Sequence, residues 1–160
     1  MTVPKSKRSE PKLHVHVELR RLVEHTLTKT SNLNKFGRVR RLEIERDEAG
    51  VMTAITETSH GSRDTLARHL QDAALDAAKR AWQANDVMVG KDGSNYDVRR
   101  ALQDACVRDL DTMLMLVNVA RSACGLSGRE AKYWTELIQS TRGLVRKWRD
   151  ADARRFRPSA

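Results

Sequence analysis

The chain has 160 residues, with 30 Lys and Arg against 21 Asp and Glu, which gives a formal net charge of +9. This length is typical of one domain, and 39% hydrophobic residues with only 8 Gly and 3 Pro exclude a compositionally disordered protein. The longest apolar run, Met113 to Val117, is too short to cross a membrane, and residues 1–12 lack the apolar stretch of a secretory signal. We therefore expect a cytoplasmic protein with no membrane partner.

Two amphipathic helices are predicted in the first half of the chain. Apolar residues recur every three or four positions from Leu13 to Asn32, which is typical of a helix with one buried face. A second helix is expected from Ser62, a suitable N-cap, to Asn85. Its apolar face is mostly alanine, so we expect a neighbouring helix to approach closely, with Trp82 filling the wider end.

Two further helices are predicted in the second half. One begins near Ser94 or Asn95 and ends at Gly125, a residue suited to the left-handed position after a helix. The next is capped by Ser127, with Glu130 three residues later completing a capping-box pattern. Because the last three helices have short connections, we expect an all-α fold, an antiparallel up-down four-helix bundle.

A β-hairpin insertion is predicted between the first two helices. Residues 39–58 alternate apolar with charged or Thr residues on both sides of a turn at Asp47 to Gly50. Two strands alone are marginally stable in water, so we expect this hairpin to lean on the bundle or on another subunit. The predicted organisation is a basic flexible arm at 1–12, a bundle at 13–152 that includes the hairpin, and a basic tail at 153–160.

The sequence contains no constellation typical of catalysis. His14 and His16 point about 200° apart on a helix and cannot share a metal ion. Cys106 and Cys124, predicted on one helix roughly 27 Å apart, cannot form a disulfide and are expected to be small buried residues. Phosphate-binding loops and nucleophile elbows are also missing from the sequence. We therefore expect a protein that is not an enzyme and has no cofactor or metal.

The positive charge is concentrated in three stretches. Residues 1–12 and 35–46 each carry a net +3, and residues 142–157 carry a net +5, so the rest of the chain has a net charge of −2. In an up-down bundle the last stretch lies at the opposite end from the hairpin, so the two basic regions form separate patches within one subunit. Asp104 and Asp111, one heptad apart, are expected to form surface ion pairs with Arg108 or with arginines of a neighbouring helix.

Clustered Arg and Lys suit a polyanion, because each neutralised phosphate releases counterions and the guanidinium fork matches phosphate oxygens. RNA or DNA is therefore the expected partner. Two alternatives remain open at this point: a charge-rich helix face that is merely solvated, and an anionic membrane surface. The candidate nucleic-acid-binding residues are Arg38, Arg40, Arg41, Arg142, Arg146, Lys147, Arg149, Arg154 and Arg155.

Several segments resemble a family of small four-helix-bundle proteins. The family includes the accessory variability determinant (Avd) of diversity-generating retroelements and the bundle proteins encoded in intervening sequences of bacterial ribosomal RNA genes. The matching segments are spread over about four-fifths of the chain; they are Leu22 to Leu27, Leu70 to Asp76, Trp82 to Asn85, Gly125 to Ser127, Tyr133-Trp134 and Trp148-Arg149. This chain departs from the family pattern by about twenty inserted residues after Lys35 to Arg38 and by its basic N-terminal arm.

The resemblance implies a homopentamer of bundles with a positively charged surface, which binds the element's reverse transcriptase and its template RNA during mutagenic cDNA synthesis and performs no chemistry. Two hypotheses follow. The first is a non-catalytic, nucleic-acid-binding accessory subunit. The alternative is a protein–protein adaptor whose hairpin docks a larger enzyme, with the positive charge serving only to steer association.

Overall fold

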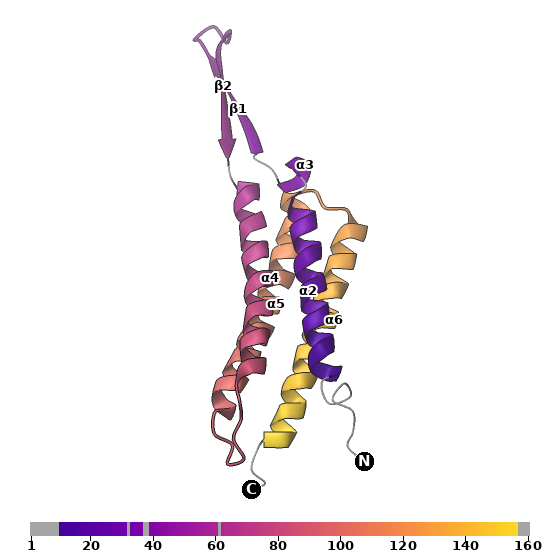
Figure 1. The fold of residues 1–160 in the computed structure, drawn as a ribbon. Coiled ribbons are helices and arrows are strands. Elements are labelled where there is room, and N and C mark those ends of the chain that lie inside the picture. The colour runs from indigo at the N-terminus through magenta and orange to yellow at the C-terminus, as the bar shows by residue number, and fades with distance from the viewer. Residues whose placement is uncertain (1–9, 32, 37–38, 61, 157–160) are drawn as a thin grey trace.

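The computed structural model of the protein describes residues 10–31, 33–36, 39–60 and 62–156, which form a helical bundle with a hairpin. The four long helices are α2 (Glu10–Thr30), α4 (Ser62–Asp86), α5 (Tyr96–Ala123) and α6 (Gly128–Phe156). They run alternately up and down (Figure 1), and each packs against the next in the cyclic order α2, α4, α5, α6. The predicted antiparallel four-helix bundle is confirmed.

The core lies where the apolar stripes of the four helices meet. Each stripe recurs at three- and four-residue spacing, so the periodicity that predicts the helices also selects the buried face. Burying one large apolar side chain contributes about 1.5–3 kcal/mol. The largest apolar side chains that are almost completely buried are Val15, Leu19, Leu22, Leu70, Leu110, Met113, Val117, Trp134, Ile138 and Val145.

The alanine face of α4 packs closely on α5, as predicted. Ala77, Ala81 and Ala84 are fully buried, and the Cys106 thiol donates a hydrogen bond to the Ala77 carbonyl over 3.2 Å. The prediction for Trp82 is wrong, because its side chain is 62% exposed. Position 82 follows the core position 81 by one residue, or about 100° around the helix axis, and therefore leaves the buried face.

The start of α6 has the predicted cap. The Ser127 hydroxyl accepts a hydrogen bond from the Glu130 amide at 3.1 Å, and the Glu130 carboxylate accepts one from the Ser127 amide at 3.3 Å. Gly125, just before this cap, has a φ of +64°, the left-handed conformation expected for it. Both cysteines are buried, and neither forms a disulfide, as predicted.

The outer ends of the bundle differ from the predicted boundaries. Helix α2 begins at Glu10, inside the predicted arm, and α6 continues to Phe156, four residues into the predicted tail. The longer α6 is stabilised by packing, because the Phe156 ring lies 6.0 Å from the Tyr96 ring of α5. The predicted start of the tail at residue 153 did not include this aromatic contact.

The insertion forms an antiparallel hairpin of β1 (Val39–Arg46) and β2 (Met52–His60). At its turn the Asp47 carboxylate accepts hydrogen bonds from the amides of Ala49 and Val51, and Gly50 adopts a φ of +80°. A short helix, α3 (Leu33–Phe36), precedes the hairpin and was not predicted. Phe36 anchors it, because its buried ring lies 6.3 Å from the Trp134 ring.

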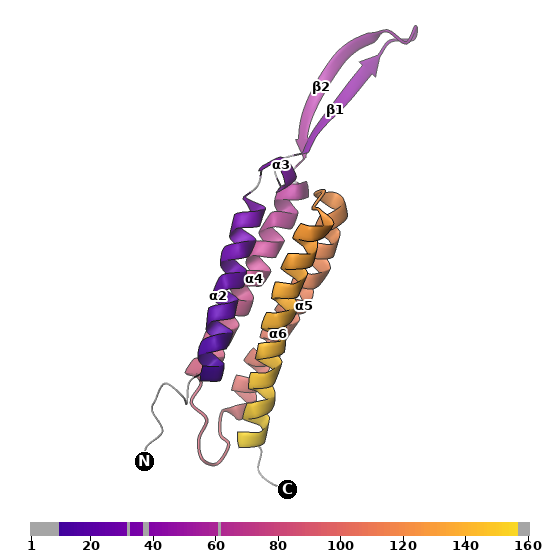
Figure 2. The same cartoon turned by 90° about the vertical axis from the view of Figure 1, so that its right-hand side faces the viewer.

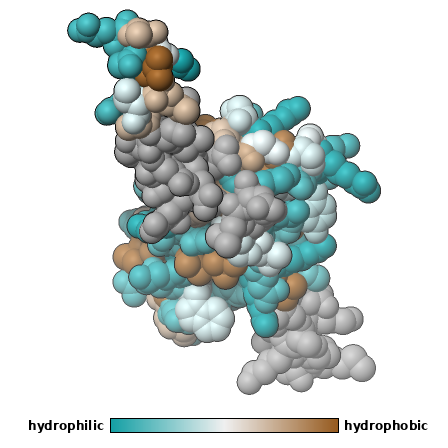
Figure 3. Space-filling model, turned by 90° about the horizontal axis from the view of Figure 1, so that it is seen from above, coloured by the Kyte–Doolittle hydropathy of each residue, from teal (hydrophilic) through white to brown (hydrophobic). Residues whose placement is uncertain are grey.

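The hairpin projects beyond the bundle (Figures 1 and 2), and within the described ranges neither strand packs along a helix. Of the two expected supports, packing on its own bundle is therefore ruled out, and packing on another subunit stays a prediction. Seen from above, it extends well to one side (Figure 3). Near its turn Val51 and Met52 are 60% and 52% exposed, so this chain alone leaves apolar groups of the hairpin uncovered.

Candidate nucleic-acid interface

The predicted basic residues fall at opposite ends of the molecule. Helix α2 begins and α6 finishes at one end, here called the terminal end, whereas the hairpin leaves the other end (Figure 1). All six predicted arginines and lysines of residues 142–155 lie on the half of α6 nearer the terminal end. Arg40 and Arg41 belong to β1, and Arg38 lies outside the described residues. The two basic regions are thus separate in one subunit, as expected.

Two of the predicted residues, Arg142 and Arg149, are bound to carboxylates of the same chain. Arg142 Nη1 donates to Asp111 Oδ1 at 2.6 Å, and Arg149 Nη1 donates to Asp104 Oδ1 at 3.1 Å. Both aspartates belong to α5, so the expected pairing with a neighbouring helix is confirmed. The seam arginines, as we call Arg142 and Arg149, are half-buried and connect α6 to α5.

The other four basic side chains of this part of α6 are differently placed. They are exposed, and none forms an ion pair with another described residue. The Arg155 guanidinium lies 5.1 Å from the centre of the neighbouring Phe156 ring and keeps its charge toward solvent. We refer to these four residues as the outer cations; they are Arg146, Lys147, Arg154 and Arg155.

A buried polar cluster at the terminal end was missed by sequence reasoning. Arg99 Nε of α5 donates to Asp152 Oδ2 of α6 at 2.6 Å, and Gln103 Nε2 donates to the same oxygen at 2.7 Å. The three side chains are 3%, 4% and 0% exposed. The Arg99 guanidinium also lies 5.3 Å from the centre of the Trp148 ring. This cluster joins α5 to the last turns of α6.

The signal for this cluster is present in the helical spacing. Position 152 follows the core positions Val145 and Trp148 at intervals of three and four, and positions 99 and 103 precede the buried Cys106 in the same rhythm. Polar residues at core positions on two adjacent helices, at the same end of a bundle, indicate a buried pair. The zero net charge of the helix that contains Arg99 gives no sign of this buried pair.

The hairpin end has less free charge than the sequence indicates. Lys35 Nζ lies 2.7 Å from the Glu130 carboxylate of α6, which ties α3 to the bundle. The hydrogen bond from Lys35 holds the pKa of Glu130 below its usual range, and the Ser127 amide acts in the same direction. Lys35 therefore contributes little to a surface for anions.

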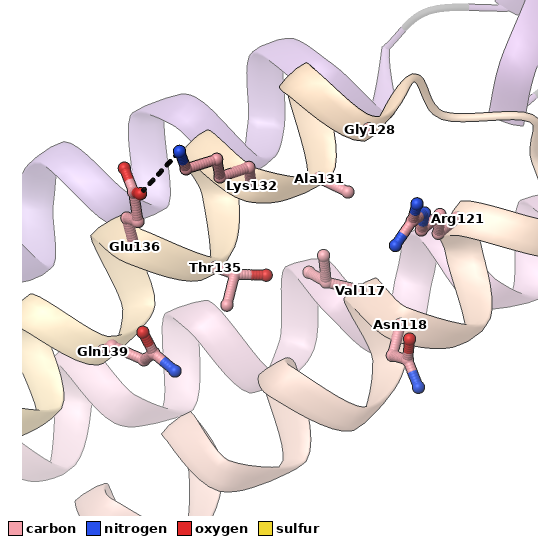
Figure 4. Close-up of a pocket in the computed structure, with 9 residues that line it drawn as sticks. All are labelled: Val117, Asn118, Arg121, Gly128, Ala131, Lys132, Thr135, Glu136 and Gln139. Carbon is pink, nitrogen blue, oxygen red and sulfur yellow. Dashed lines mark ion pairs between the residues drawn. The ribbon is translucent and has the colours of Figure 1, made fainter.

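A shallow groove of about 300 Å³ lies between α5 and α6 (Figure 4). Its polar side chains are Asn118 and Arg121 from α5 and Thr135 and Gln139 from α6. Lys132 and Glu136, one turn apart on α6, form a 3.8 Å ion pair. These groups are able to donate and accept hydrogen bonds, but they do not pair a nucleophile with a base. Across the described ranges, His, Cys, Asp and Glu side chains do not cluster in a set of three that suits a metal ion.

The Cys106 thiol is likewise not suited to nucleophilic chemistry. Burial raises its pKa to about 12, and the nearby Asp109 carboxylate acts in the same direction. A thiol with such a pKa carries almost no thiolate at neutral pH, and the thiolate is the reactive form. Its place beside the Ala77 carbonyl fits close packing of α4 on α5.

None of the described helices is both long enough and apolar enough to cross a membrane.

Comparison with known proteins gives no further guide to function. The chain matches no protein-family model, no curated protein and no solved structure.

Proposed function

We propose that this protein is a non-catalytic accessory subunit that binds RNA or DNA through phosphate groups. Its terminal end carries the outer cations, and in the sequence Lys5, Lys7 and Arg8 precede α2, which begins at the same end. Exposed guanidinium and ammonium groups without carboxylate partners remain available to phosphate oxygens. The absence of ion pairs on the outer cations, among the described residues, is the observation that carries this proposal.

The family resemblance narrows the proposed partners. By that resemblance the protein binds a reverse transcriptase and its template RNA, and it assembles as a homopentamer. Assembly would multiply the terminal-end cations around one particle, which raises avidity for a long polyanion. An rRNA intervening-sequence protein is the other branch of the same resemblance.

The test is the salt dependence of RNA affinity in matched double variants. Arg146→Gln with Lys147→Gln removes two outer cations, whereas Arg142→Gln with Arg149→Gln removes two seam arginines and changes the net charge equally. Each lost phosphate contact reduces the slope of log affinity against log salt by about 0.7 for a single strand. We expect a reduction of about 1.4 for the outer double variant and a much smaller one for the seam double variant.

Two outcomes would count against this proposal. A slope near zero for the unmodified protein would refute phosphate binding altogether. Equal reductions in the two double variants would mean that only net charge matters and that the outer cations make no direct contact. Urea unfolding of each variant, measured in parallel, separates lost contacts from lost structure.

The projecting hairpin favours the adaptor as a second candidate function. It contacts little of its own bundle and exposes Val51 and Met52, as expected of a segment that is covered by another protein. Replacing residues 39–60 by a short Gly-Ser linker tests this. Loss of reverse-transcriptase capture with unchanged RNA affinity supports the adaptor, and unchanged capture contradicts it.

A further inference from the structure

Trp82 is the most exposed of the three tryptophans of the chain. It is 62% exposed, whereas Trp134 and Trp148 are 0% and 3% exposed. It stands on α4, four residues before the helix ends at Asp86, or about 6 Å along the axis. It therefore lies close to the terminal end of the bundle.

A second aromatic side chain supports this ring from the bundle side. The His16 ring of α2 lies 5.4 Å from the Trp82 ring at 62°, in an edge-to-face arrangement, and 6.3 Å from the buried Trp148 ring of α6. The series Trp82, His16, Trp148 thus links the exposed indole to the core. Such support restrains the indole before any ligand arrives, which lowers the entropy lost on binding.

The surroundings of Trp82 are polar and limit what can cover it. Lys79 and Asp86, about one turn away on each side, are both exposed and charged, and Gln83 is exposed. Cores of protein–protein interfaces are depleted in charged residues. The exposed face of the Trp82 indole is therefore better suited to stacking with one flat ring than to a broad contact with another protein.

The positive charge at the terminal end indicates which kind of flat ring would stack on Trp82. His16 lies six residues, about 9 Å along the axis, from the start of α2 at the terminal end. The outer cations Arg154 and Arg155 end α6 at the same end. Proteins that bind single strands combine cations along the backbone with aromatic rings on which unpaired bases stack.

We propose that Trp82 is a stacking site for an unpaired nucleobase of a single strand whose phosphates contact the outer cations. This inference rests on the proposed function, and it narrows the ligand from nucleic acid in general to unpaired RNA or DNA. A duplex would contact the same cations, but its bases are already stacked on one another and do not reach the indole.

The experiment compares three variants on three probes. The variants are Trp82→Ala, Trp82→Phe and, as a matched control two turns earlier on the same helix, Leu75→Ala, whose side chain is 47% exposed. The probes are a 12-nucleotide oligouridylate, an abasic phosphodiester strand of equal length and an RNA duplex of equal charge. Fluorescence anisotropy gives the affinities, and intrinsic tryptophan fluorescence reports stacking directly.

We expect Trp82→Ala to weaken oligouridylate binding by about 5- to 150-fold while leaving the abasic strand and the duplex unaffected. Trp82→Phe should retain most of the affinity because it keeps an aromatic face, and Leu75→Ala should match the unmodified protein. Oligouridylate, but not the abasic strand, should quench the tryptophan fluorescence, because two of the three tryptophans are buried.

Other results overturn the inference. If Trp82→Ala binds oligouridylate as tightly as the unmodified protein, or loses equal affinity for the abasic strand, the ring does not stack on a base, although the proposed function stands. A lower sedimentation coefficient of the Trp82→Ala protein without RNA would show that a second copy covers the ring. If no probe binds at all, the proposed function fails, and this inference fails with it.

Discussion

The two sides of α6 carry charged side chains in two different states. Toward α5, Arg142, Arg149 and Asp152 each bind an opposite charge of that helix, whereas the outer cations have no carboxylate partner among the described residues. Sequence composition assigns all the arginines to one basic cluster. The comparison teaches that the number of charges available to a ligand depends on which of them the fold already neutralises.

The largest effect is expected when the buried pair is broken. Arg99→Met leaves Asp152 buried without its cation, and such a loss typically costs about 3–5 kcal/mol. Urea unfolding followed by circular dichroism should show this decrease in the free energy of unfolding with an unchanged denaturant slope.

A double variant tests the origin of that cost. Arg99→Met combined with Asp152→Leu removes both charges, and an apolar replacement of a buried pair is often neutral or stabilising. We therefore expect the second substitution to restore most of the lost stability. If the double variant is less stable than Arg99→Met, the cost arises from packing around Trp148 and not from an unpaired charge.

The half-buried pairs along the same seam should matter less. Arg142→Gln removes the 2.6 Å contact with Asp111, whose carboxylate is 46% exposed, and water can replace the lost partner. Ion pairs of this kind are worth about 0.2–1 kcal/mol. A thermal shift assay at low and high salt should show a small decrease in melting temperature that shrinks with salt. A loss as large as that of Arg99→Met would contradict the distinction between buried and surface pairs.

Most of the fold follows from the sequence, because helices are specified locally. The spacing of Leu19, Leu70 and Leu110 predicts three of the buried faces, and Ser127, Glu130 and Gly125 predict where one helix ends and the next begins. Trp82 shows the limit of this reasoning: hydrophobicity predicts burial, but its angular position on the helix places it outside the core.

The candidate site was less predictable because pairing depends on how helices meet. Asp104 and Asp111 were expected to bind arginines of a neighbouring helix, yet their partners Arg149 and Arg142 were also proposed to contact nucleic acid. The relative register of α5 and α6 decides between these roles. Helical periodicity within one segment does not predict that register. Asp152 was missed for a related reason, since its partner lies 53 residues away.

The side of α6 that packs on α2 contacts His25, a residue that makes stability depend on pH. The His25 ring of α2 lies edge-on to Tyr133 and Trp134 at 5.0 and 5.7 Å, and burial, with Lys29 and Arg21 nearby, lowers its pKa below 6.5. The unfolded chain therefore takes up the proton first as the pH falls, so stability contributed by neutral His25 is lost as the pH falls below 6.5. We expect urea midpoints to decline between pH 7 and pH 5 and His25→Gln to flatten this decline. A decline of the same size in both proteins would assign it to other groups.

The smallest effect on stability is expected on the outer side of α6. Arg146→Gln removes a charge that forms no ion pair with a described residue, and exposed substitutions of this kind usually change the free energy of unfolding by no more than about 0.5 kcal/mol. Its stability should therefore match that of the unmodified protein, while its RNA affinity falls more steeply than that of Arg142→Gln. The two arginines, four residues apart on one helix, would then have different roles: Arg142 in stability and Arg146 in RNA binding. If Arg146→Gln instead destabilises the fold as much as Arg142→Gln does, both sides of α6 stabilise the fold, and the proposal that the outer cations bind a ligand is wrong.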